Sequence, residues 1–398
     1  MTFDVTAVRD QFPALTSGVA YFDGPGGTQT PAAVGEAIAR TITGPLSNVG
    51  TITLGERRAN ASVSGFRSAF ADLLGVAPAG IVHGRSATQL TYDIARALAK
   101  DWGPGDEVVV SRLDHDCNVR PWVQAAERAG ATLRWLRLDP ATAELDLGDL
   151  DEVVNERTRL VAVTAASNLL GTKPPVARIA ERAHAVGALT YVDGVHYAAH
   201  SAVDVAALGA DFFVCSPYKF FGPHCGVLAA DPALLDTLAP DKLAPSPDTV
   251  PERFEYGTLP YEILAGATAT VDFIAGLAPD GDGRRERLRA AHEAIDRHEL
   301  RLRRRIEDGL AGFGDRVTLH SRAADRTPTL LVTFAGREPF DAYRFLAERD
   351  IAAPAGTFYA YEPARVLGLD AGLRVGLAPY NDDAEIDRLL TALEDFLG

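Results

Sequence analysis

Short apolar runs alternate with helical patterns along this chain, and that alternation limits the folds available to it. The runs are continuous rather than alternating in polarity, which is typical of strands covered on both faces. They include residues 81–84, 106–111, 159–167, 188–194 and 211–216. Amphipathic segments such as 175–187, with glycine at its end, separate them. The pattern predicts an α/β fold with a mostly parallel sheet wrapped by helices.

The chain is long enough for two domains. We expect residues 21–278 to form a large domain and residues 279–398 a small α+β domain, with residues 1–20 packing on the small one. The Pro-rich stretch 239–260 predicts a surface loop. Arginines interspersed with acidic residues over 283–313 predict a solvated, salt-bridged helix.

Composition argues against several classes of function. A net charge of -15 argues against binding to nucleic acid or to an anionic membrane surface. No apolar stretch reaches membrane-spanning length, and no signal peptide is visible at the N-terminus. Cys117, Cys215 and Cys225 are too few for a disulfide framework and lack zinc-site spacing. We therefore expect a reduced, cytoplasmic protein.

A lysine and an aspartate lie at the ends of two apolar runs. Lys219 lies between the run DFFVCS and a Gly-Pro break, and Asp193 closes the run ALTYVDG. A buried lysine is costly unless it is paired or used, and burial lowers its pKa. This pair suggests a site for pyridoxal 5'-phosphate (PLP), with the lysine as Schiff base and the aspartate at the pyridinium nitrogen. Thr88 opens a helix after a turn, either as an ordinary cap or as a binder of the cofactor phosphate.

The order of motifs resembles that of PLP enzymes with the class V aminotransferase fold (fold type I), and most of all their cysteine desulfurase-like subgroup. The motifs are YFDGPGGTQTP, GRSATQL, DHDCNVRPW, SNLLGT, VDGVHY, SAVDVAALGADFF, SPYKFFGP, FEYGT and LRVGLAPYN. They cover nearly the whole chain. The resemblance implies PLP as cofactor, bound in the large domain, a small amino-acid substrate, and a homodimer with shared active sites.

Carried over residue by residue, the resemblance implies a set of site residues. The phosphate contacts would be Ala87, Thr88, Gln89, Ser216, Tyr218 and, from the neighbouring subunit, Thr258. His115 would stack on the ring, Asn168 would hydrogen-bond its phenolic oxygen, and His196, where desulfurases usually have glutamine, would lie near that oxygen. Arg374 would clamp the substrate carboxylate. We place Asn48, Arg120 and Tyr359 at the substrate pocket. His196 and His200 are four residues apart but lack a third ligand, so no metal is expected.

The chain departs from the desulfurases at one place. Their persulfide-forming cysteine lies on a mobile loop before the last motif, and residues 351–381 contain no cysteine. Tyr359 stands near that position and is a candidate acid, base or hydrogen-bond donor, but it cannot carry sulfane sulfur.

The remaining machinery leaves several reactions open. The first is a C–S β-lyase without a persulfide cysteine, and the second is a β-decarboxylase or desulfinase that forms an enamine for protonation or C–C bond formation. A third is transamination or epimerisation. Retention of Lys219 and Asp193 argues against a relative that has lost the cofactor.

Overall fold

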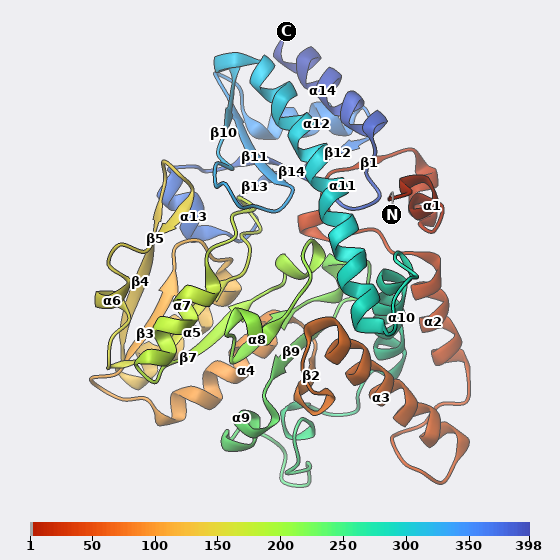
Figure 1. Cartoon of the computed structure of the whole chain (residues 1–398), viewed down its shortest axis with the longest axis vertical. Helices are drawn as coiled ribbons and strands as arrows, with labels where there is room; N and C mark the ends of the chain where they lie inside the picture. The colour runs from red at the N-terminus through yellow and green to blue at the C-terminus, as the bar shows by residue number, and fades with distance from the viewer. Residues whose placement is uncertain (1–2) are drawn as a thin grey trace.

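An eight-stranded sheet forms the centre of the larger part of the computed structural model, which describes residues 3–398 (Figure 1). In spatial order its strands are β2 (Ile81–Gly84), β9 (Gly226–Ala230), β8 (Phe212–Cys215), β7 (Leu189–Asp193), β6 (Thr158–Thr164), β3 (Glu107–Ser111), β4 (Thr132–Asp139) and β5 (Glu144–Asp146). The five strands from β8 to β4 run parallel, whereas β2, β9 and β5 pair antiparallel. The predicted α/β fold with a mostly parallel sheet is confirmed.

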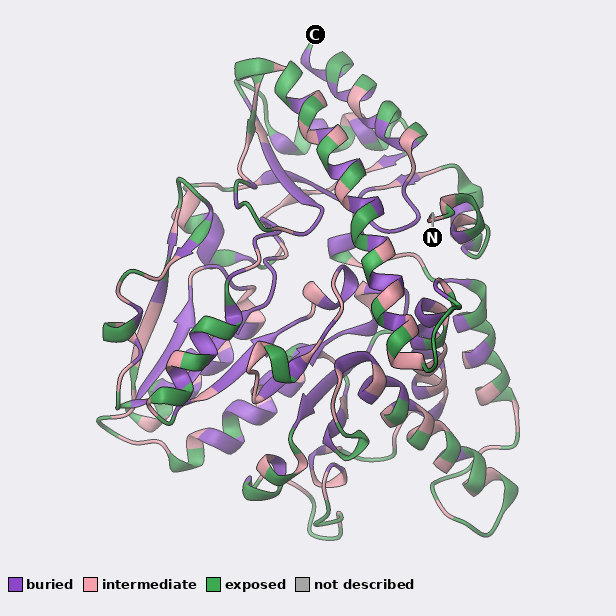
Figure 2. Cartoon of the chain, viewed as in Figure 1, coloured by how far each residue is buried: buried purple, intermediate pink, exposed green. Residues whose placement is uncertain are grey.

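Both faces of this sheet are covered, as the continuous apolar runs predict. On β3, Val108 and Val110 pack into one buried cluster while Val109 between them packs into the other. Figure 2 shows the central strands as buried and the outer faces of the surrounding helices as exposed. Helices α4 (Ala87–Leu98) and α5 (Arg120–Ala129) supply one face, and α7 (Val176–Ala185) contributes to the other.

The C-terminal part holds a second, antiparallel sheet. Its strand order is β10 (Val317–Leu319), β11 (Thr329–Phe334), β14 (Gly372–Gly376) and β13 (Ala355–Gly356). Helices α12 (Pro339–Ala347) and α14 (Asp383–Leu397) pack on it. The long α11 (Arg284–Gly312) extends from α10 (Tyr261–Gly276) in the larger part to α14 in the smaller (Figure 1). The division at residues 278 and 279 stays a prediction.

The remaining helices lie around these two sheets. They are α1 (Val5–Arg9), α2 (Ala32–Thr43), α3 (Leu54–Leu74), α6 (Leu150–Val153), α8 (Val205–Leu208), α9 (Pro232–Thr237) and α13 (Tyr361–Leu367). The sequence pattern did not predict helices α2, α3 or α13. For α3 a local signal exists, because Thr53 and Glu56 form a capping box at its start. Among residues 3–398, no helix combines the length and the apolar character needed to cross a membrane.

The N-terminal segment contacts the C-terminal part of the chain. Strand β1 (Ala20–Tyr21) pairs in parallel with β12 (Ile351–Ala352), and Ala20 and Phe22 lie in the same buried cluster as α12 and α14. The Arg9 guanidinium donates to the Tyr380 carbonyl at 2.6 Å and to Glu385 at 2.9 Å. Residues 1 and 2 of the predicted 1–20 segment lie outside the described residues.

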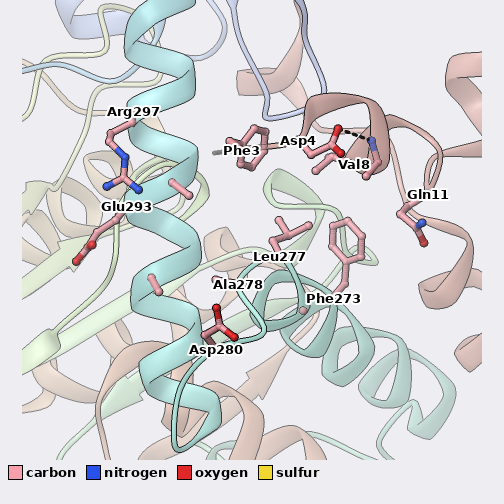
Figure 3. A pocket seen from close by; sticks show the side chains of 14 residues that line it. Phe3, Asp4, Val8, Gln11, Phe273, Leu277, Ala278, Asp280, Glu293 and Arg297 are labelled. Carbon is pink, nitrogen blue, oxygen red and sulfur yellow. Dashed lines mark hydrogen bonds between the residues drawn. The ribbon is translucent and has the colours of Figure 1, made fainter. Parts of the chain in front are cut away.

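Helix α1 also borders a groove that it shares with α10 and α11. Phe273 and Leu277 of the α10 end form its apolar floor, and Glu293 and Arg297 of α11 stand at its rim (Figure 3). The Asp4 carboxylate in this groove already has a hydrogen-bond partner, because it caps α1 by accepting from the Ala7 amide. The groove is therefore part of how the N-terminal helix rests on α10 and α11.

The exposed side of α11 carries the predicted ion pairs. The acidic partners of its arginines, however, come largely from other elements. Arg301 and Arg305 of α11 both pair with Asp383 at the start of α14, each at 2.7 Å. A pair within the helix, Arg303 with Glu307, is longer at 3.3 Å. The charges of α11 thus serve to join it to its neighbours.

Candidate active site

A cavity lies at the carboxyl ends of the parallel strands, where α/β sheets bind ligands. Strand β7 ends there in Asp193, and β8 leads through Ser216 into a short turn that ends in Lys219. We call it the strand-end cavity. Its lining residues are Ser86, Ala87, Thr88, His115, Cys117, Thr164, Ala166, Asn168, Asp193, Val195, His196, Ser216, Tyr218 and Lys219.

All the predicted cofactor contacts except Gln89 and Thr258 line the strand-end cavity. The Gln89 side chain turns away and bonds the Arg85 amide and the Asp93 carboxylate. Thr258 is exposed on the loop after residue 254, as is Asn48 on the loop between α2 and α3. This chain therefore brings neither Thr258 nor Asn48 to the cavity, and the roles of all these residues stay predictions.

Lys219 lies in surroundings that favour a neutral amine. Its Nζ donates to the Pro25 carbonyl at 2.5 Å and lies 4.8 Å from the centre of the Tyr218 ring. Burial, and then the charge of Arg374, lower the Lys219 pKa to about 7. An amine with that pKa is a nucleophile at neutral pH, which an ordinary lysine is not.

Asp193 is buried and held by two donors. Its Oδ1 accepts from the Val195 amide at 2.9 Å, and the Cys117 thiol donates to Oδ2 at 3.5 Å. Burial raises the Asp193 pKa, and these two hydrogen bonds and Lys219 oppose that effect. Nearby Asp114 has a pKa raised to about 8 by burial, so at neutral pH it is mostly protonated.

His115 is neutral and its tautomer is defined. Its Nδ1 accepts a hydrogen bond from the Cys117 amide at 3.0 Å, so the ring proton lies on Nε2. Burial, and then Lys219 and Arg374, lower the His115 pKa to about 4. A flat, uncharged ring at the cavity wall suits stacking on an aromatic cofactor.

The opposite end of the cavity is the N-terminus of α4. Ser86 caps the helix by accepting from the Gln89 amide at 3.1 Å, and the Ala87 and Thr88 amides have no partner within the helix. Strand β9 approaches closely here, because a Cβ on Gly226 would lie 2.4 Å from the Ser86 carbonyl carbon. The result is a cradle for an anion such as phosphate. With Lys219 and Asp193, it makes the cavity fit PLP.

Arg374, on β14, is buried to 2% exposure without a carboxylate partner among residues 3–398. Its Nη1 donates to the Asn168 carbonyl at 3.0 Å, while Nε has no partner. The guanidinium carbon lies 3.6 Å from the centre of the Phe358 ring. Burial lowers the Arg374 pKa to about 9. A buried guanidinium with free donors favours an incoming carboxylate.

Tyr359 lies at the mouth of the site rather than inside it. Its side chain is 79% exposed, and its ring centre lies 5.7 Å from that of His115. Phe358 and Tyr359 both have positive φ angles, 54° and 58°, and two hydrogen bonds hold them there. Asn168 Nδ2 donates to the Phe358 carbonyl at 3.0 Å, and the Asp116 amide donates to the Tyr359 carbonyl at 2.8 Å.

Arg120 shares the surface pocket of Tyr359 and pairs with Asp116 at 3.0 Å. Sequence analysis missed Pro25, whose carbonyl contacts Lys219, although the FDGPGG segment signals close backbone approach. Cys117, which its proximity to His115 in the sequence allows to approach the cofactor, was not assigned a site role, and it lines the cavity. Within residues 3–398, no group of three or more His, Cys, Asp or Glu could hold a metal ion.

Comparison with known proteins decides the family. The model of the family "Aminotransferase class-V" matches residues 20–389. The chain belongs to the class-V aminotransferases. Enzymes of this family depend on PLP, so this class-V aminotransferase is a PLP-dependent enzyme of the cysteine desulfurase-like kind.

Three relatives show how far the likeness to this class-V aminotransferase extends. An uncharacterised protein of Mycobacterium tuberculosis is 33% identical, with 99% of each chain covered. A probable cysteine desulfurase of Pseudomonas aeruginosa is 32% identical, covering 97% of this chain and 96% of that one. The crystal structure of a cysteine desulfurase from Escherichia coli superimposes with a TM-score of 0.88 at 29% identity, covering 99% and 98% of the two chains.

Proposed function

We propose that this class-V aminotransferase cleaves a C–S bond at Cβ of a small amino acid by elimination, without a cysteine persulfide. The placement of its three thiols carries this proposal. Cys215 and Cys225 are buried, and burial raises the pKa of both. Cys117 borders the cavity, but it donates to Asp193, and burial holds its pKa well above the ordinary value. A sulfur carrier must be an accessible thiolate, and none of the three meets that requirement.

The loop that carries the cysteine in desulfurases supports the same conclusion. Here it presents the Tyr359 ring beside His115, with its backbone bonded to Asp116. A phenol at this mouth can donate a proton or a hydrogen bond to a leaving group, but it cannot accept sulfur.

Each group in the strand-end cavity has a distinct role in holding the cofactor or the substrate. Lys219 is the amine that would hold PLP by its aldehyde, Asp193 the carboxylate for its pyridine nitrogen, and the α4 N-terminus the cradle for its phosphate. When bound, PLP supplies an electron sink for charge that develops at the substrate Cα. Arg374 would orient the substrate carboxylate.

The Lys219 amine then moves the proton at Cα. Its pKa of about 7 means that the neutral and charged forms are both well populated near neutral pH. The same group can therefore take the proton and later return it. His115, neutral at this pH, would align the ring without competing for the proton.

A homodimer with shared sites is also part of the proposal. Thr258, predicted to reach a neighbouring subunit, is exposed, as is Tyr256 beside it. Exposed apolar side chains also gather around the loop between α2 and α3, namely Ile42, Val49, Ile52 and Leu54. Such a group favours an interface over free surface. The three free cysteines are in keeping with a cytoplasmic protein.

Product analysis tests the reaction. Holoenzyme with cysteine would give sulfide, ammonia and pyruvate in equal amounts if elimination occurs. Transfer of sulfur to a thiol would instead give alanine, with the sulfur retained on the protein. Alanine with sulfite from cysteine sulfinate, or with carbon dioxide from aspartate, would favour the desulfinase or decarboxylase alternative. Transamination would require a keto-acid acceptor.

A variant without thiols provides the matched control. Replacement of Cys117, Cys215 and Cys225 by alanine should leave pyruvate formation within a few-fold of wild type, provided that PLP still binds. Loss of turnover with intact PLP absorption, together with persulfide on the wild-type protein, would overturn the elimination mechanism.

A further inference from the structure

A line of buried polar side chains leads from the strand-end cavity to α11. His196, which lines the cavity, has its Nε2 2.9 Å from the hydroxyls of both Thr327 and Thr329. The His200 ring centre lies 4.9 Å from that of His196. On the far side, His200 Nδ1 lies 2.8 Å from Oε2 of Glu299, on α11.

Burial of the Glu299 carboxylate at this position is unfavourable for folding. It is 1% exposed, its Oε2 contacts His200, and its Oε1 has no hydrogen-bond partner among the described residues. A carboxylate in such a place costs stability compared with an apolar side chain of similar size. Apolar packing of α11 is supplied by other residues of the same helix, because Leu302 lies in an apolar cluster and Ile295 is also buried.

The groups that face this line set its charge state. Lys219, Arg374 and Lys173 act on His196 together with His200, and burial with these charges holds the His196 pKa well below its ordinary value. Burial raises the Glu299 pKa, while His200 and Lys173 lower it and Asp296 raises it. His292 faces His200 from α11 through the same buried region.

His196 lines the strand-end cavity and has one nitrogen free in the described part of the chain. The two threonine hydroxyls occupy Nε2, and Nδ1 has no partner within residues 3–398. The ring is therefore fixed at one nitrogen by strand β11 and the residues before it, and open at the other. His200 packs edge-on against its flank, with an interplanar angle of 71°.

We propose that Glu299 and His200 are positioning residues that set the electrostatic potential at the cofactor through His196. An imidazolium at His200, paired with the Glu299 carboxylate, would place a positive charge directly behind the neutral His196. That charge would oppose protonation of PLP bound in the strand-end cavity. This role goes beyond the family's shared dependence on PLP, because it lies in residues behind the cavity wall.

The visible absorption of bound PLP provides the readout, because its bands change with protonation. Glu299→Gln keeps the size and a hydrogen bond but removes the charge that holds the proton on His200. His200→Asn keeps an N–H donor near the Nδ1 position without a titratable group. In both variants the midpoint of the pH titration of the PLP absorption should rise, by about half a unit or more.

A remote histidine serves as the control. His320 likewise bonds a threonine hydroxyl, that of Thr333 at 2.9 Å, but it directly follows β10 of the small sheet and does not line the cavity. In His320→Asn the pH titration of the PLP absorption should keep the wild-type midpoint. The proposal would be overturned if Glu299→Gln and His200→Asn both bind PLP and their PLP absorption titrates with the wild-type midpoint. Should Glu299→Gln not fold, the His200→Asn titration decides alone.

Discussion

The guanidinium carbon of Arg374 lies 3.6 Å from the centre of the Phe358 ring, which covers one face of the charged group. Nη1 is engaged by the Asn168 carbonyl, so donors on the remaining edge stay available. An aromatic face holds the guanidinium in place without neutralising it, since it offers no charge. The site is therefore arranged in advance for a carboxylate in a region from which water is largely excluded.

Phe358→Ala should raise the KM for the amino-acid substrate about tenfold with little change in kcat, because a hydrated guanidinium attracts a carboxylate less strongly. Steady-state kinetics measures both constants. Phe340→Ala, at an exposed phenylalanine on α12, is the matched control. An unchanged KM in Phe358→Ala would show that the ring has no part in binding the carboxylate.

Gly226→Ala should weaken PLP binding about tenfold, because the new Cβ would push Ser86 and the α4 N-terminus away from β9. Overpacking of this kind costs about 1–3 kcal/mol of stability. Equilibrium titration of the apoprotein with PLP measures the affinity, and thermal unfolding measures the stability. Gly103→Ala, where a Cβ would meet nothing within 4 Å, should leave both unchanged. Wild-type affinity in Gly226→Ala would mean that the helix terminus does not hold the phosphate.

Capture of PLP by the apoprotein should accelerate as pH rises through about 7, since the Lys219 amine loses its charge there. Stopped-flow absorbance at several pH values measures the rate. A midpoint near 10, typical of an exposed lysine, would contradict the placement of Lys219 in an apolar environment.

The same shift has a consequence for stability with a definite sign. The Lys219 pKa falls from 10.5 in the unfolded chain to about 7 in the folded one, so between these values the unfolded state binds more protons. The apoprotein should therefore gain stability with rising pH across that window relative to Lys219→Met. Denaturant unfolding of the two proteins at both ends of the window tests this, because other groups cancel in the difference.

Tyr359→Phe should lower kcat about tenfold and leave PLP binding unchanged, because the hydroxyl lies at the mouth, outside the strand-end cavity. Absorbance of the holoenzyme and kinetics measure the two effects. Tyr361→Phe, on the same exposed surface pocket, should retain full turnover. Loss of the PLP absorption in Tyr359→Phe would place this residue in cofactor binding instead.

The local pattern of apolar residues in the sequence was sufficient to predict most of the fold. Continuous apolar runs located the strands at the centre of the sheet within one or two residues at most ends, because burial on both faces leaves a strong signal. An apolar run does not reveal strand direction, and β9 pairs antiparallel with both of its neighbours, β2 and β8. Direction depends on the connection, and the turn at Lys219 reverses the chain without a crossover helix.

The site could be predicted where a residue follows a strand or begins a helix, as Asp193, Lys219 and Thr88 do. Contacts between distant segments had no such signal. The Pro25 carbonyl reaches Lys219 across 194 positions, and the hydrogen bond from Asn168 to the Phe358 carbonyl spans 190. Charge state is equally non-local, because the neutral His115 results from burial and from two cations on other elements.

The parallel pairing of Ala20 with Ile351 has a consequence for biosynthesis. During translation the first strand emerges long before its partner exists, so it must wait exposed until nearly all of the polypeptide has left the ribosome. The smaller sheet region thus closes last and includes the start of the chain. Loss of Ala20 and Phe22 would therefore open the buried cluster that also contains Leu373 and Val375, the neighbours of Arg374.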